Sequence, residues 1–106
     1  MKDERREQLL KQLRGIVTDV LDSENVQVYL FGAWARKEEK GSSDIDIAIN
    51  PGEGEISPKK WLELLEKVEE STIPYNVDIV DMKKVNVKLG KNIKREGILW
   101  KDFKNE

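Results

Sequence analysis

Two aspartates, Asp44 and Asp46, lie two residues apart in a stretch, residues 44–49, where polar and apolar residues alternate. Side chains two apart on a β-strand project from one face, roughly 6.5–7 Å apart. Two carboxylates at that separation repel each other unless a cation lies between them. The functional interpretation is a divalent metal ion bound by both carboxylates. The alternative is a solvent-facing acidic strand, since aspartate is common on sheet edges.

A third aspartate, Asp78, lies in another predicted strand at residues 76–81, between the apolar residues Val77 and Ile79. If the two strands are neighbours, three carboxylates share one sheet face without basic residues among them. The chain has no histidine and no cysteine, which removes imidazole and thiolate ligands. Oxygen ligands favour Mg²⁺, Mn²⁺ or Ca²⁺. The alternative for Asp78 is an aspartate on an edge strand.

A glycine, Gly32, follows a predicted strand at residues 26–31 and opens a short turn or helical segment. Glycine lets the backbone approach a phosphate closely, and amide groups at a helix N-terminus attract anions. Arg36 in this segment either contacts a phosphate or is solvated. Ten residues, 34–43, separate the Gly32-Ala33 pair from Asp44, and this combination is more specific than any of its parts.

These strings resemble the nucleotidyltransferase superfamily that includes DNA polymerase beta, whose signature is Gly-Ser, about ten residues, then Asp-x-Asp. The segments FGAWAR and GSSDIDIAI are similar to those of the minimal nucleotidyltransferases (MNT). The resemblance extends to VDIVD at residues 77–81 and to the REGILW segment near the C-terminus. It implies a polymerase beta-like α/β (α+β) fold, with a small mixed sheet flanked by helices, and a single nucleotidyltransferase domain over residues 1–106.

The resemblance also implies roles for individual residues. Asp44 and Asp46 would bind the metals that bridge a triphosphate, and Asp78 would help to bind the catalytic metal and to deprotonate the attacking hydroxyl. The cofactor would be Mg²⁺ or Mn²⁺, and the substrate ATP or another NTP. MNT proteins resemble antitoxins paired with HEPN-domain toxins, which implies transfer of AMP to a toxin tyrosine. The residues expected to bind nucleotide are Gly32, Ala33, Arg36 and Ser43.

One position, Ala33, departs from the family pattern, which has serine there. Family members use that hydroxyl to bind triphosphate oxygens, a hydrogen bond worth roughly 1.5–3 kcal/mol. A second hypothesis is therefore a catalytically weak or inactive antitoxin that neutralises its partner by occlusion. A third, a purely structural domain, requires the ten-residue spacing to be accidental.

Apolar periodicity and turn residues predict the elements that position these groups. Trp61 is expected to be buried, because it lies on the apolar stripe of the helix that begins at Ser57-Pro58. Trp34 either packs locally, stacks on a base or anchors an interface, and Trp100 either covers the core or docks a partner. Asp81 is expected at a cap or turn. The predicted elements are a helix at 3–22, strands at 26–31 and 44–49, a helix beginning at Ser57-Pro58 with the stripe Trp61, Leu62, Leu64, Leu65 and Val68, a strand at 76–81, a helix at 85–96 and an extended tail at 98–100.

Charge and length limit the function further. The chain of 106 residues has 19 Lys and Arg against 21 Asp and Glu, which argues against binding nucleic acid through bulk charge. No apolar run reaches membrane-spanning length, so a cytoplasmic location without membrane contact is expected. One small sheet face leaves few residues to hold a base and an acceptor. A complex with a HEPN-like protein or a homo-oligomer is therefore expected, with Trp34 or Trp100 at the contact.

Overall fold

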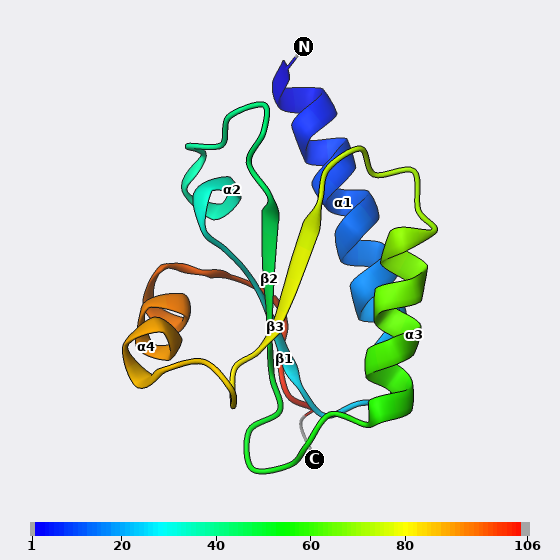
Figure 1. Cartoon of the computed structure of the whole chain (residues 1–106), viewed down its shortest axis with the longest axis vertical. Helices are drawn as coiled ribbons and strands as arrows, with labels where there is room; N and C mark the ends of the chain where they lie inside the picture. The colour runs from blue at the N-terminus through cyan, green and yellow to red at the C-terminus, as the bar shows by residue number, and fades with distance from the viewer. Residues whose placement is uncertain (1, 105–106) are drawn as a thin grey trace.

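The computed structural model describes residues 2–104, whose helices and strands surround a mixed four-stranded sheet (Figure 1). The sheet order is β3-β2-β1-β4. β1 pairs antiparallel with β2 and β4, and β2 pairs parallel with β3. The predicted fold class is confirmed. The elements are α1 (Lys2–Val20), β1 (Gln27–Phe31), α2 (Ala33–Arg36), β2 (Ile45–Asn50), α3 (Pro58–Glu69), β3 (Val77–Asp81), α4 (Val87–Glu96) and β4 (Ile98–Lys101).

The two faces of the sheet are covered differently (Figure 1). The long helices α1 and α3 lie together on one side and close the main hydrophobic core, to which Leu13, Val17 and Leu64 contribute fully buried side chains. The opposite side carries α4 and the short α2. There a small second cluster forms around Ala48 and Ile93. One face is therefore a sealed core, and the other is only partly covered.

Strand β2 shows why the sheet has this asymmetry. Its isoleucines, Ile45, Ile47 and Ile49, are 0% exposed and face α1 and α3. The residues between them, among them Asp46, point to the α4 side, as the period of two requires. The predicted alternation is confirmed with one shift, because the strand begins at Ile45 and Asp44 precedes it as an exposed residue.

The segment predicted as an extended tail, residues 98–100, is extended, but its pairing within the sheet was not predicted. Residues Ile98–Lys101 form strand β4, which pairs antiparallel with β1. Gly97 allows this docking, since a Cβ atom there would press against the carbonyl oxygens of Ile93 and Leu30. Trp100 is 8% exposed and belongs to the main core, so it covers the core of its own chain.

The apolar stripe predicted for α3 is only partly correct. Leu64 is buried, and Trp61 and Val68 are partly buried against the core, so Trp61 is less enclosed than expected. Leu62 is 57% exposed and Leu65 39% exposed. Both lie at the side of the stripe, because one helix contacts the core over a limited arc.

Polar side chains fix the boundaries of the later elements. Ser57 caps α3, accepting a hydrogen bond from the amide of Lys60 at 3.4 Å, with Pro58 in the first turn as predicted. Asn86 caps α4 in the same way. Asp81 is the predicted turn residue, and its Oδ1 accepts from the amide of Lys83 at 2.9 Å. Among the described residues, no helix combines the length and the apolar character needed to cross a bilayer.

Candidate active site

Strand register brings Asp46 and Asp78 together. Asp46 on β2 has Asp78 of β3 as its Cα partner on one side and Phe31 of β1 on the other. Neighbouring strands lie about 4.8 Å apart, and paired residues point to the same face. The two aspartates therefore stand side by side on the face toward α4. Asp44 lies two residues before Asp46 and lines, together with Asp78, a groove beside β3.

Gly32 is required beside Asp46 for two reasons. It follows Phe31 directly, and its φ of 75° lies in the region that glycine adopts without strain. A Cβ atom at this position would also collide with Oδ2 of Asp46. The spacing recognised in the sequence thus has a geometric cause. Because Phe31 pairs with Asp46, the residues between them form the connection of an antiparallel pair, and Gly32 must lie next to the aspartate.

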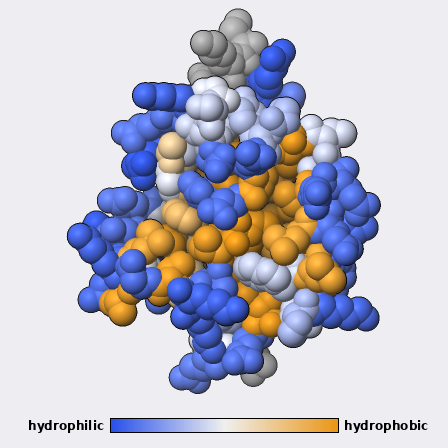
Figure 2. Space-filling model, in the orientation of Figure 1, coloured by the Kyte–Doolittle hydropathy of each residue, from blue (hydrophilic) through white to orange (hydrophobic). Residues whose placement is uncertain are grey.

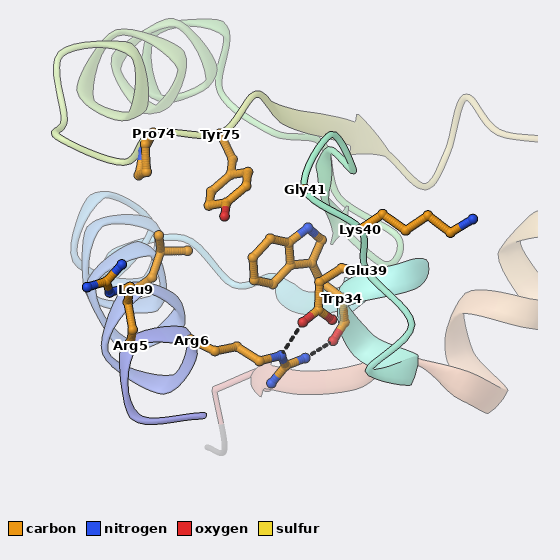
Figure 3. Close-up of a pocket in the computed structure, with 9 residues that line it drawn as sticks. All are labelled: Arg5, Arg6, Leu9, Trp34, Glu39, Lys40, Gly41, Pro74 and Tyr75. Atoms are coloured by element: carbon orange, nitrogen blue, oxygen red, sulfur yellow. Dashed lines mark hydrogen bonds and ion pairs between the residues drawn. The ribbon is translucent and has the colours of Figure 1, made fainter. Parts of the chain in front are cut away.

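Trp34 holds the connection between Gly32 and Asp44 in place (Figure 3). Its Nε1 donates to the carbonyl oxygen of Ser43 at 3.1 Å, and its ring packs edge-on against Tyr75, with centroids 5.0 Å apart and planes at 71°. The indole is 4% exposed. Of the three roles considered for Trp34, local packing is the one observed, and this packing fixes the residue that precedes Asp44.

Arg6 of α1 supports the same connection from below. Its Nε donates to Oε2 of Glu39 at 2.9 Å, its Nη2 donates to the carbonyl oxygen of Trp34, and its guanidinium lies 5.7 Å from the indole centroid (Figure 3). The hydroxyl of Ser43 accepts from the amide of Lys40 at 2.9 Å. That hydroxyl therefore closes a turn of the loop, and nucleotide binding by Ser43 stays a prediction.

The carboxylates influence each other electrostatically. Burial raises the pKa of Asp46, and the neighbouring carboxylates of Asp78 and Asp44 raise it further. Arg36, which lies on α2 and not among the carboxylates of the sheet face, opposes these effects and lowers the pKa of Asp46. The Arg36 side chain is exposed and bonds to Glu38 at 2.7 Å, which raises its own pKa. The site concentrates negative charge around one half-buried group.

The donor chemistry fits a hard divalent cation, while the side-chain positions do not yet enclose one. Only carboxylate oxygens are offered, and the pKa of Asp46 is raised by two like charges that a cation would neutralise. Within residues 2–104, however, no group of three acidic side chains is arranged so that it could hold a metal ion. Asp44 and Asp78 are both exposed, so rotation of two surface side chains would be needed to complete a site.

A cleft between α2 and α4 adds residues that the sequence did not suggest. Gly32 and Arg36 line it from one side, and Leu89, Asn92 and Glu96 from the other. Its volume of about 220 Å³ is below the roughly 300–1,000 Å³ of pockets that enclose small molecules. Helical periodicity in α4 places these three residues near one another, but nothing local indicates that this helix packs beside Gly32.

The proposed aromatic anchors are not available at the surface. Trp34 and Trp100 are 4% and 8% exposed, and both belong to the main core. The expectation that one of them lies at a partner contact is wrong for this conformation, because both indoles are already covered by their own chain. The exposed large hydrophobic residues are Leu62, Leu65, Val87, Ile98 and Leu99.

Comparison with known families decides the assignment. The model of the family described as "Polymerase beta, Nucleotidyltransferase" matches residues 16–104. The chain belongs to this family. The matched segment includes Gly32, the three aspartates and strand β4, so the resemblance seen in the sequence is confirmed over most of its length. No curated protein matches the chain.

Solved structures of low sequence identity share the fold. A toxin–antitoxin crystal structure with AMP-PNP is 22% identical, with a TM-score of 0.65, covering 86% of this chain and 74% of that chain. A mutant of the MntA–HpeT toxin–antitoxin is 20% identical, with a TM-score of 0.63 and the same coverage. A putative nucleotidyltransferase from Sulfolobus solfataricus is 22% identical, with a TM-score of 0.52, covering 97% of this chain and 92% of that chain.

Proposed function

We propose that this chain is a cytoplasmic antitoxin-type nucleotidyltransferase that transfers a nucleoside monophosphate, AMP from ATP, to a hydroxyl group of a partner protein. The observation that carries the proposal is the register that sets Asp46 beside Asp78, with Gly32 against the Asp46 carboxylate. Membership of the polymerase beta family supports the reaction type. The toxin–antitoxin structures that share the fold support a toxin as the partner, and the resemblance to MNT proteins suggests a tyrosine of a HEPN-type toxin as the acceptor.

Each site residue has a distinct task in this proposal. Asp44, Asp46 and Asp78 would hold Mg²⁺ or Mn²⁺, which when bound neutralises triphosphate charge and polarises the reacting phosphate. The backbone at Gly32 and Ala33 would approach the triphosphate oxygens. Arg36 would exchange its exposed bond to Glu38 for a phosphate oxygen, since that ion pair is solvated and weak. Ser43 is proposed to bind nucleotide through the loop that it closes.

The proposed reaction forms one bond to phosphorus, breaks another and moves one proton. The acceptor hydroxyl oxygen forms a bond to the α-phosphorus, the bond from that phosphorus to pyrophosphate breaks, and the hydroxyl proton passes to a carboxylate. Asp78 is the proposed proton acceptor, because it is exposed on an edge strand where an acceptor can reach it. The hydroxyl must be held in line with the leaving group, which is mainly a demand on position.

A partner is proposed to complete the site, because the cleft beside Gly32 is too small to enclose a triphosphate and its base. A HEPN-like protein or a second copy of the chain would supply the missing wall. The alternative function is an antitoxin that binds and occludes its partner without transferring a nucleotide. Ala33 favours this alternative, because it lacks the hydroxyl that the family uses on the triphosphate.

Labelled nucleotides separate the two functions. The chain, Mg²⁺ and the purified product of a neighbouring gene are incubated with ATP labelled on the α-phosphorus, and in parallel with ATP labelled on the γ-phosphorus. The proposal predicts label on the partner from the α-labelled nucleotide only. Label from the γ-position would indicate a kinase, and a stable complex without label would establish occlusion instead.

A further inference from the structure

The outer edge of β3 is open in the part of the chain that the structure describes, since β3 pairs only with β2. The amide of Met82 donates to the carbonyl oxygen of Ile49 at 2.9 Å, which shows which peptide groups face inward. Peptide groups alternate along a strand. Those of even-numbered residues therefore face β2, and the N–H and C=O groups of Val77 and Ile79 point away from the sheet.

A groove of about 840 Å³ follows this edge, between β3 and α3. Figure 2 shows hydrophobic surface in the middle of this face of the molecule. Leu65 lines the groove and is 39% exposed, although it is a large apolar side chain. Exposed apolar surface beside unpaired strand edges is a feature of sites that receive an extended peptide. The apolar lining consists of Leu65, Val68, Ile73, Val77 and Ile79, with Tyr75 at one end.

The charged residues that line this β3-edge groove are Asp44, Glu69 and Asp78, all acidic. Two of them belong to the proposed site, so the groove opens directly onto the carboxylates. An extended segment bound here would be complementary if its apolar side chains were flanked by lysine or arginine. Rim charges of this kind select a partner and speed its association.

We propose that the β3-edge groove binds an extended segment of the acceptor protein, which adds a strand to β3 and places its hydroxyl residue opposite Asp78. The inference rests on the proposed function for the identity of the segment as acceptor. Paired residues on adjacent strands point to the same face. A residue opposite Asp78 therefore lies on the carboxylate side, while its two neighbours point to the α3 side, into the apolar groove. The acceptor motif is a hydroxyl residue between two apolar residues, with basic flanks.

A designed peptide tests the binding without any nucleotide. The probe is Lys-Lys-Thr-Val-Tyr-Val-Thr-Lys-Lys, titrated into the isotope-labelled chain and followed by amide chemical shifts. The proposal predicts the largest shifts and slowed hydrogen exchange at Val77 and Ile79. The open edge of β4, where Ile98 is 45% and Leu99 41% exposed, is an internal comparison. Shifts centred on β4, or none at saturating peptide, would overturn the proposal.

Two pairs of variants locate the contact. Leu65→Gln should weaken binding at least about fivefold, while Leu62→Gln, on the same helix but outside the groove, should leave it unchanged. Val77→Pro should weaken binding at least about fivefold more than Val77→Ala, because proline removes the outward N–H and alanine keeps it. Thermal melts verify that each variant folds. Equal affinities within both pairs would show that the peptide does not use the β3 edge.

The same variants separate this inference from the proposed function. Peptide binding at β3 without nucleotide transfer would support the groove and contradict the enzyme. Transfer to the partner at parental rate by both Leu65→Gln and Val77→Pro would support the enzyme and contradict the groove.

Discussion

The two faces of strand β2 differ in what they contribute, although they alternate residue by residue along one short segment. Toward α1 and α3, Ile45, Ile47 and Ile49 are completely buried. Toward α4, Asp46 is half-buried beside Asp78, and its pKa is raised by burial and like charge. The apolar face stabilises the strand, and the polar face carries a charge arrangement that is unfavourable without a ligand. Stability and proposed activity are thus assigned to opposite faces, which makes them separable by substitution.

The largest expected effect is on activity at the polar face. Asp46→Asn should lower nucleotide transfer about 10³-fold or more, equivalent to about 4 kcal/mol, because it removes a carboxylate that is proposed to bind the metal. The fold should be as stable as the parent or more stable, since a half-buried charge that its neighbours repel is lost. Initial rates and urea unfolding measure the two quantities. Asp19→Asn on α1 removes a charge elsewhere and should change neither one. A clear loss of stability in Asp46→Asn would contradict the separation of the faces.

A substitution on the apolar face of the same strand should lower stability. Ile47→Ala should lower the free energy of unfolding by about 2–5 kcal/mol, because it leaves a cavity in a closely packed core. Ile98→Ala, at a 45% exposed isoleucine on β4, should cost less than about 1 kcal/mol. Urea titration with tryptophan fluorescence gives both values. Similar costs at the two positions would show that the α1–α3 face is not the main source of stability.

Sequence patterns predicted the parts of the molecule that depend on local spacing. The period of two in residues 44–49 predicted that Asp46 would lie on the sheet face opposite to the buried isoleucines, because side chains alternate along a strand. The spacing from Gly32 to Asp44 predicted the family, because this spacing follows from the pairing of β1 with β2. The role of β4 depends on a distant partner strand, so local pattern alone indicated only an extended tail. Burial of Trp34 depends on Arg6 and Tyr75, which are 28 and 41 residues away in the chain, and no local signal specifies such contacts.

The connection that positions Asp44 should be the next most sensitive region. Arg6→Met should lower the free energy of unfolding by about 1.5–3 kcal/mol, because Oε2 of Glu39 loses the guanidinium that donates to it. The other oxygen of this carboxylate, Oε1, is buried and has no hydrogen-bond partner that could compensate. Nucleotide transfer should fall together with the stability, as the loop loosens. Arg5→Met, at the adjacent exposed arginine, is the control and should have little effect. If the two variants unfold at the same urea concentration, the ion pair between Arg6 and Glu39 does not stabilise the fold.

Restoring the hydroxyl that the family has at position 33 should raise the affinity for ATP. Ala33→Ser should tighten ATP binding about tenfold, because a hydroxyl bonding to a charged oxygen contributes at least about 1.4 kcal/mol. Calorimetry with ATP and Mg²⁺ measures the change. Adenosine, which has no phosphate, should bind the two proteins equally. An unchanged affinity for ATP would mean that the triphosphate does not contact the segment after Gly32.

The smallest expected effect is on the pH dependence of folding. The folded-state pKa of Asp46 lies above the ordinary value of 3.8, so the folded chain binds a proton more tightly than the unfolded chain. Its unfavourable contribution is complete above the raised pKa and disappears as pH falls toward the ordinary value. The stability advantage of Asp46→Asn should therefore be greatest at neutral pH and shrink on acidification. Unfolding curves at several pH values test this, and an advantage that grows on acidification would contradict it.

Asp44, Asp46 and Asp78 are proposed to form one metal–nucleotide site beside Gly32. Paramagnetic Mn²⁺ broadens the amide signals of nearby residues, so it reports the position of the ion directly. With ATP and substoichiometric Mn²⁺, broadening should be centred on Gly32, Asp46 and Asp78 and should disappear in the Asp44→Asn, Asp46→Asn double variant. Broadening spread over the other acidic side chains of the chain, or persisting unchanged in the double variant, would show that the three aspartates do not form one metal site.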